Sequence, residues 1–198
     1  FEQFASLLGF IAACYLAILM MFIVHALILV LSGNNPVHYF KTVWPVLTFA
    51  FVSRSSAASI PLAISAQEKF GVQNTIANIA ASFGSSMGKN GCAGIYPAIM
   101  VAMIAPTIGI DPLSVHFLLA MLPAIALGSI GVAGVGGGGT FAALIVLSTL
   151  NFPVALVGIF IAIEPVVDMA RTALNVNGSM MSGVLANRLL KKSTEKPQ

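Results

Sequence analysis

Residues 128–140 have the sequence GSIGVAGVGGGGT, and they lie in the middle of an uncharged segment that runs from Pro112 to Ile163. The segment is long enough to cross a lipid bilayer. A helix that faces lipid does not tolerate this many glycines, because each costs about 1 kcal/mol relative to alanine. We therefore interpret residues 113–152 as a helical hairpin that enters and leaves a membrane on the same side, with the glycines at its tip.

The composition of the whole chain indicates that lipid covers most of its surface. Hydrophobic residues make up 58% of the 198 residues and charged residues only 8%, and the mean hydropathy is +0.98. Too few polar side chains remain to coat a surface that faces water. The composition predicts an all-α integral membrane protein, with membrane lipid as a partner and no nucleic acid.

The remaining segments predict two kinds of membrane element. Residues 4–33 predict a transmembrane helix, and residues 74–106 predict a second one that is broken at 88–91. Residues 42–67 are interrupted by the polar sequence SRSSAAS at 53–59, so each half is too short to cross and a second re-entrant hairpin is expected. Residues 154–190 predict the last transmembrane helix, which a tail at 191–198 follows.

After the first helix, these elements form a repeat: a hairpin followed by a broken helix occurs twice. Such pairs indicate an inverted-repeat transporter with its site near the membrane midplane. By the positive-inside rule, Lys41 and Lys69 place the first hairpin on the cytoplasmic side and the basic tail makes the C-terminus cytoplasmic. The glycine-rich hairpin then opens to the outside. Because no signal-peptide features precede residue 4, we expect a truncated start that lacks upstream helices.

One face of the last predicted helix carries polar groups at spacings of three and four residues. These residues are Glu164, Asp168, Arg171, Asn175 and Ser179. One interpretation is an internal ion pair of Asp168 with Arg171. The other, which we favour, is a site for a zwitterion, in which Asp168 receives an ammonium group and Arg171 grips a carboxylate.

Other polar or glycine-rich positions at membrane depth leave alternatives open. The serine tip at 53–56 is either a polar cap or an anion site at a helix end. The glycine tip is either a helix contact or a lid. Lys89 is either paired permanently with Glu164 or titrates during a transport cycle.

Four ordered motifs resemble the dicarboxylate/amino acid:cation symporters, the glutamate-transporter family. They are SRSS followed by a proline (53–61), NGCAGIYP (90–97), GVAGVGGG (131–138) and DMARTALNVNG (168–178). The resemblance covers the whole chain and is closest to the bacterial L-cystine uptake branch. It implies a homotrimer in which a moving domain slides past a fixed scaffold, with this chain forming the C-terminal portion of such a protein.

The resemblance also implies a set of substrate-binding residues. Ser56 and Asn175 would hold the substrate's α-carboxylate, Asp168 its amino group and Arg171 a distal carboxylate. Cys92 takes the place of a threonine in the pocket, and residues 135–139 would form the lid. The complete implied set is Ser55, Ser56, Cys92, Val135, Gly139, Asp168, Arg171, Thr172 and Asn175.

The residues implied for ion coupling depart from the pattern of sodium-dependent members. Those members have an asparagine and an aspartate in the broken helix and an aspartate late in the last helix, where this chain has Gly88, Asn90 and Ser179. A hard cation such as Na⁺ needs oxygen ligands, and here those ligands are partly missing. The coupling ion, H⁺ or Na⁺, is therefore left open and no metal site is firm. No cofactor is expected. Our hypothesis is that protons couple through Glu164 or Lys89, or that Lys89 replaces sodium. The coupling candidates are Gly84, Ser86, Lys89, Asn90, Ser129, Glu164 and Ser179.

The sequence thus predicts a multi-pass secondary transporter of the bacterial inner membrane, with L-cystine as the favoured cargo. Glutamate, aspartate or another dicarboxylate is the alternative within the family, and a channel is the alternative of another class. An enzyme is not expected. A serine hydrolase is disfavoured because the chain's histidines, His25, His38 and His116, lie away from the serine tip in this arrangement.

Overall fold

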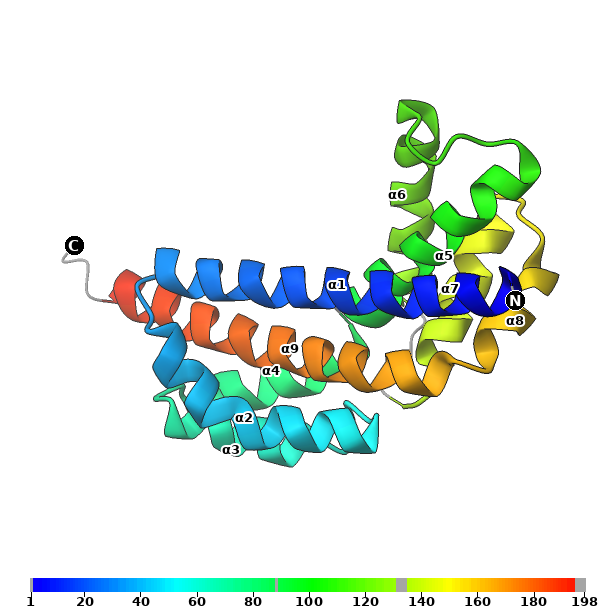
Figure 1. Ribbon diagram of the computed structural model, residues 1–198. Coiled ribbons are helices and arrows are strands. Elements are labelled where there is room, and N and C mark those ends of the chain that lie inside the picture. Colours follow the sequence, from blue (N-terminus) through cyan, green and yellow to red (C-terminus); the bar gives the residue numbers. More distant parts are fainter. Residues whose placement is uncertain (1, 88, 131–134, 195–198) are drawn as a thin grey trace.

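The computed structural model describes residues 2–87, 89–130 and 135–194, and every regular element in these ranges is a helix (Figure 1). Two long helices, α1 (Glu2–Leu31) and α9 (Glu164–Thr194), lie side by side along the molecule. Among the described residues, α1 and the segment from Asn74 to Ile108 are long and apolar enough to cross a membrane.

The next two helices, α2 (Pro36–Ser53) and α3 (Ile60–Lys69), form a hairpin. α2 begins before residue 42, the predicted start of this segment, because Asn35 caps it: its Oδ1 accepts hydrogen bonds from the amides of Val37 (2.9 Å) and His38 (3.2 Å). α2 ends where Arg54 adopts a left-handed conformation, with φ of 52°. The polar segment predicted to interrupt this region therefore lies between the two helices.

The segment predicted as a broken helix consists of four short pieces. These are α4 (Asn74–Ser86), the π-helix η1 (Asn90–Ile95), α5 (Tyr96–Ile104) and the 3₁₀ turn η2 (Ala105–Ile108). Gly91 lets η1 approach α9 closely, because a Cβ there would lie 2.9 Å from the Arg171 carbonyl oxygen. The irregular piece is thus held against the middle of α9.

The glycine-rich segment contributes α6 (Val115–Ile130) and α7 (Gly138–Thr149), which pack against each other. A Cβ at Gly128 would lie 3.0 Å from a methyl carbon of Val146, so glycine permits the close contact. Residues 131–134 of the predicted tip lie outside the described residues.

The prediction of one helix over 154–190 is wrong. The structure has a 3₁₀ turn η3 (Val154–Leu156), a short helix α8 (Val157–Ile161), a turn at 162–163, and then α9. Pro165 explains the break, since its ring would clash with the Ile161 carbonyl in a continuous helix and it has no N–H to donate. Proline is tolerated in the first turn, so α9 restarts at Glu164. It also extends to Thr194, into the predicted tail.

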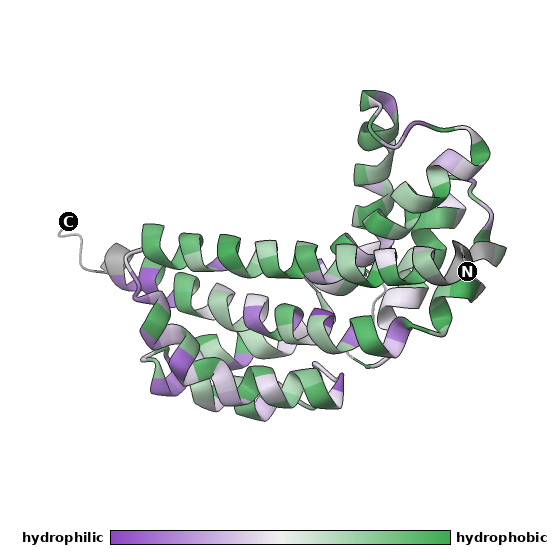
Figure 2. Cartoon of the chain, in the orientation of Figure 1, coloured by the Kyte–Doolittle hydropathy of each residue, from purple (hydrophilic) through white to green (hydrophobic). Residues whose placement is uncertain are grey.

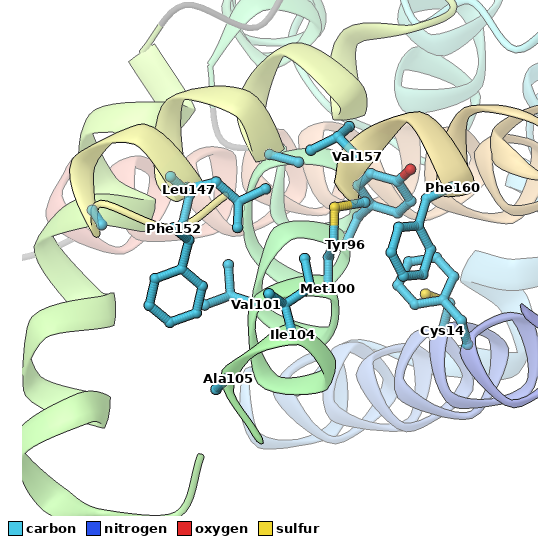
Figure 3. Packing of buried hydrophobic residues seen from close by; sticks show 14 of the residues in the cluster. Cys14, Tyr96, Met100, Val101, Ile104, Ala105, Leu147, Phe152, Val157 and Phe160 are labelled. Carbon is cyan, nitrogen blue, oxygen red and sulfur yellow. The ribbon is translucent and has the colours of Figure 1, made fainter. Parts of the chain in front are cut away.

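Two apolar clusters hold these helices together. The first joins α1, α5, α7 and α8, and Figure 3 shows Tyr96 and Met100 packed among Cys14, Leu147 and Phe160. The second joins α1, α2, α3, α4 and α9. Outside both clusters, α1 exposes more than half of each of several large apolar side chains, and its ribbon is largely green in Figure 2. These side chains are Leu16, Leu19, Met20, Ile23 and Leu27. Such a surface is stable against lipid or further apolar protein.

Candidate functional site

The centre of the site is Arg171, which is completely buried on α9. Its Nη2 donates to Asp168 Oδ1 at 3.0 Å and to Glu164 Oε1 at 3.3 Å. Its guanidinium carbon lies 3.9 Å from the centre of the Tyr96 ring, a cation–π contact that is strong when desolvated. One positive group is therefore held between two carboxylates and an aromatic face.

The ion pair of Asp168 and Arg171 does not satisfy all of its own hydrogen-bonding atoms. Asp168 Oδ2 and the Nε and Nη1 atoms of Arg171 are buried without a hydrogen-bond partner, as are Thr140 Oγ1 and the Tyr96 hydroxyl. Each unmet buried polar group costs about 1–3 kcal/mol, and more when it is charged. The site thus leaves one negative acceptor and two cationic donors to be satisfied by something else.

The glycine segment covers this pair. A Cβ at Gly136 would lie 3.7 Å from Asp168 Oδ2 and 4.0 Å from the carbonyl oxygen of Arg54, so the two hairpin tips meet at Asp168. A Cβ at Gly139 would overlap Arg171 Nη1. Glycine at these positions therefore lets the backbone lie directly on the charged groups. Glu164 also accepts a hydrogen bond from the Thr140 amide at 3.2 Å.

The π-helix η1 supplies the opposite wall. Asn175 Oδ1 accepts a hydrogen bond from the Gly91 amide at 2.8 Å, and Asn175 Nδ2 donates to Cys92 Sγ at 3.0 Å. Cys92 Sγ lies 3.9 Å from Asp168 Oδ1. Cys92, Asp168 and Asn175, all predicted as site residues, are thus brought together in one contiguous network.

The other predicted substrate residues surround this network unevenly. Ser56 is buried and Ser55 is partly buried at the first hairpin tip, where Ser55 Oγ accepts a hydrogen bond from the Ala58 amide at 3.1 Å. Thr172 is buried on α9, whereas Val135 is more than half exposed at the second tip.

Lys89 is buried, and its pairing with Glu164 is not found. Glu164 pairs with Arg171 instead, because both lie on the same side of α9 two turns apart. Within the described ranges, no carboxylate forms an ion pair with Lys89. Lys89 is therefore a buried basic side chain next to the π-helix.

The remaining coupling candidates do not form one cluster. Gly84 packs tightly on Ser179, since a Cβ at Gly84 would overlap the Ser179 Cβ. Ser179 Oγ donates to the Val176 carbonyl at 2.9 Å, and Ser129 Oγ donates to the Ala126 carbonyl at 2.7 Å. Ser86 is exposed.

A second polar network, which sequence reasoning missed, lies around His25. His25 Nδ1 is 2.8 Å from Asn177 Nδ2, and His25 Nε2 is 3.3 Å from Asn90 Nδ2. Asn177 Oδ1 in turn accepts from the Tyr39 hydroxyl at 3.1 Å. An imidazole with one proton has one donor and one acceptor, so Nδ1 accepts from Asn177 and Nε2–H is left for Asn90. A rotated Asn90 amide supplies the acceptor, Oδ1, which otherwise has no partner.

Only one signal in the sequence pointed toward this network: His25 is the one histidine between residues 4 and 36, a range that contains no Asp, Glu, Lys or Arg. Its partners come from α2, η1 and α9, so local periodicity does not reveal them. The contact of Tyr96 with Arg171 was missed for the same reason.

Replacing His25 with leucine is expected to destabilise the folded protein. The substitution leaves Asn177 Nδ2 and the buried Oδ1 of Asn90 without a hydrogen-bond partner, which costs about 1–3 kcal/mol for each group. The temperature of unfolding of the full-length protein in detergent should fall by several degrees. His116→Leu makes the same change at an exposed histidine and should leave the unfolding temperature unchanged. Equal unfolding temperatures for the two variants would contradict this role of His25.

Comparison with known proteins adds to this geometry. The model of the sodium:dicarboxylate symporter family matches residues 1–189. The L-cystine uptake protein TcyP of Bacillus cereus is 58% identical over 183 residues, which are 92% of this chain and 39% of the relative. TcyP of Bacillus licheniformis is 55% identical over 188 residues, 95% of this chain and 41% of the relative.

A protein named as an uncharacterized symporter in Haemophilus influenzae is 55% identical over 185 residues, 93% of this chain and 42% of that protein. The chain thus spans about two fifths of the length of these relatives. The family match extends over nearly all of its residues, and the chain belongs to the sodium:dicarboxylate symporter family.

Proposed function

We propose that this chain is the substrate-carrying part of a secondary transporter that imports L-cystine across a bacterial inner membrane. One observation carries the proposal: the buried Asp168 and Arg171 keep an acceptor oxygen and two donor nitrogens without partners under the glycine segment. An α-amino acid brings an ammonium group for the acceptor and a carboxylate for the donors. The function is transport rather than catalysis, and no nucleic acid takes part.

L-cystine is favoured over other amino acids for two reasons. Relatives that are 55–58% identical bear the name L-cystine uptake protein. Cystine also has a zwitterionic group at each end, so Asp168 and Arg171 can bind different ends or the same end. Glutamate and aspartate fit Arg171 through their distal carboxylate and are the alternative cargo.

The proposed arrangement in the membrane follows from the helices. We propose that α2 with α3 and α6 with α7 are re-entrant hairpins that enter from opposite sides and form an inverted repeat with the broken segment and α9. Lys41 and Lys69 favour the cytoplasmic side for the first hairpin, with the C-terminus on the same side. The full protein would work as a homotrimer in which this domain moves as an elevator against scaffold helices.

Uptake of labelled L-cystine by the full-length protein in proteoliposomes tests the function. We expect saturable uptake that unlabelled L-cystine abolishes, with aspartate and glutamate competing weakly. Strong competition by aspartate would indicate that the substrate is a dicarboxylate and not L-cystine. Uptake that does not saturate would reject a carrier in favour of a channel.

We propose that protons rather than sodium drive uptake, through Glu164 or Lys89. Glu164 contacts both Arg171 and the Thr140 amide, so a proton on this carboxyl group would act directly on the charged site. Lys89 is a buried basic side chain next to Asn90, one of the positions where the family resemblance implies a sodium ligand. We propose that Lys89 substitutes for sodium.

A comparison of ion gradients tests this coupling. Uptake should proceed with an inward proton gradient and no sodium, and it should not proceed with an inward sodium gradient at equal pH. Full activity under the sodium gradient alone would contradict the role proposed for Lys89.

A further inference from the structure

A second polar pocket lies far from the charged site, where α1, α3 and α9 end together near the C-terminus (Figure 1). Its volume is about 180 Å³. Its polar lining includes Asn34, Asn187, Arg188 and Lys191, and its apolar lining includes Phe70 and Val184. Figure 2 shows hydrophilic residues gathered at this end of the molecule, in contrast to the apolar length of α1.

The pocket contains one buried unsatisfied donor and two basic side chains. Asn34 Nδ2 is buried and has no hydrogen-bond partner. The guanidinium of Arg188 lies against the backbone of Gly33, and neither Arg188 nor Lys191 forms a side-chain hydrogen bond or ion pair with any residue in the described ranges. Two cationic groups and an unpaired amide donor therefore line one space.

The acceptors nearby are already used. Asn187 Oδ1 accepts a hydrogen bond from the Gln73 amide at 3.2 Å, while its Nδ2 donates to the Gly71 carbonyl at 3.2 Å. Glu68 Oε1 accepts from Asn74, and neither residue lines the pocket. The chemistry that completes this pocket is consequently an anion with several acceptor oxygens.

The depth of the pocket in the membrane determines which anions can reach it. α1 has 30 residues and α9 has 31, so each is about 45 Å long, against about 30 Å for the hydrocarbon core of a bilayer. Their shared end therefore reaches the headgroup layer. Basic pockets between membrane helices at this level bind phosphate-containing headgroups.

We propose that the pocket lined by Asn34, Arg188 and Lys191 binds the phosphate of an anionic phospholipid headgroup. Arg188 and Lys191 supply the positive charge, and Asn34 supplies a neutral donor that fixes the position of one phosphate oxygen. Phe70 and Val184 contact the apolar part of the same lipid. The pocket joins the end of α1 to the end of α9, so a bound lipid fastens these two helices at the membrane surface.

Lipid binding to the full-length protein tests the proposal. Native mass spectrometry in detergent would follow the retention of phosphatidylglycerol, with zwitterionic phosphatidylcholine as the comparison. Arg188→Gln is expected to weaken phosphatidylglycerol binding by about fivefold or more, the loss of one charge near the surface. Asn34→Ala keeps the net charge and should weaken binding by about threefold or more, the loss of one hydrogen bond.

Lys69→Gln is the matched control, because it removes an exposed charge at the same end without touching the pocket. It should change the affinity by less than about twofold, as expected for a charge outside the site. Equal losses in Lys69→Gln and Arg188→Gln would overturn the proposal in favour of diffuse attraction. Unchanged binding in Arg188→Gln and Asn34→Ala would also overturn it.

Inorganic phosphate distinguishes the two sources of a phosphate group. Calorimetric titration of the lipid-depleted protein should show no binding of inorganic phosphate at millimolar concentration. If inorganic phosphate bound with the same dependence on Arg188 and Asn34 while phosphatidylglycerol did not, the pocket would serve a free anion and the lipid assignment would be wrong.

Discussion

Replacing Arg171 with lysine is expected to lower the affinity for L-cystine by about a hundredfold while the protein stays folded. The Nη2 atom of Arg171 already holds Asp168 and Glu164, and its Nε and Nη1 remain for a substrate carboxylate. A lysine ammonium neutralises the two acids, but it is a single point charge and cannot hold both sides at once. It also loses the planar contact with Tyr96.

Equilibrium binding of labelled L-cystine to the purified full-length protein measures this loss. Arg188→Lys is the control, since it makes the same substitution at an exposed arginine and should leave L-cystine binding unchanged. The thermal unfolding of Arg171→Lys should stay close to that of the wild type, because the buried carboxylates keep a cation. Unaltered L-cystine affinity in Arg171→Lys would show that the guanidinium does not bind the substrate.

Replacing Gly139 with alanine is expected to reduce L-cystine uptake by at least about tenfold, the consequence of overpacking by 1–3 kcal/mol. The added methyl group would occupy the place of Arg171 Nη1. Either the guanidinium leaves its position over Tyr96, or the second hairpin tip lifts from the site. Both outcomes separate the donors from the bound carboxylate.

Gly158→Ala is the matched control for this substitution. A Cβ at Gly158 meets nothing within 4 Å, and alanine favours a helix over glycine. Its initial rate of L-cystine uptake in proteoliposomes should equal that of the wild type. A similar loss in both variants would mean that glycine matters for helix packing in general and not for contact with Arg171.

The breaks in the helices were predictable where the residues themselves prevent a helix in lipid. The polar run at 53–59, the glycine at 91 and the glycines at 136–137 each fall at or beside an observed interruption. The turn at 162–163 was missed, although Pro165 marks it. Its surroundings are apolar, and hydrophobicity alone gives no reason to divide the segment.

The polar stripe of α9 was also predictable, because its spacing is local to one helix. What that stripe contacts was not. Arg171 contacts Tyr96 and forms the ion pair with Glu164 that was considered for Lys89. Asn177 forms a hydrogen bond with His25, which lies 152 residues earlier in the chain. Such contacts depend on how whole helices pack, and periodicity carries no information about partners that distant.

The central claim is that Asp168 and Arg171 bind the two charged groups of an α-amino acid. Equilibrium binding of L-cystine and two blocked analogues tests it most directly. N,N′-diacetyl-L-cystine lacks the ammonium groups and L-cystine dimethyl ester lacks the carboxylates. We predict that each analogue binds about a hundredfold more weakly than L-cystine, since each leaves one buried charge of the pair unpaired. Binding of either analogue as tight as that of L-cystine would contradict the claim.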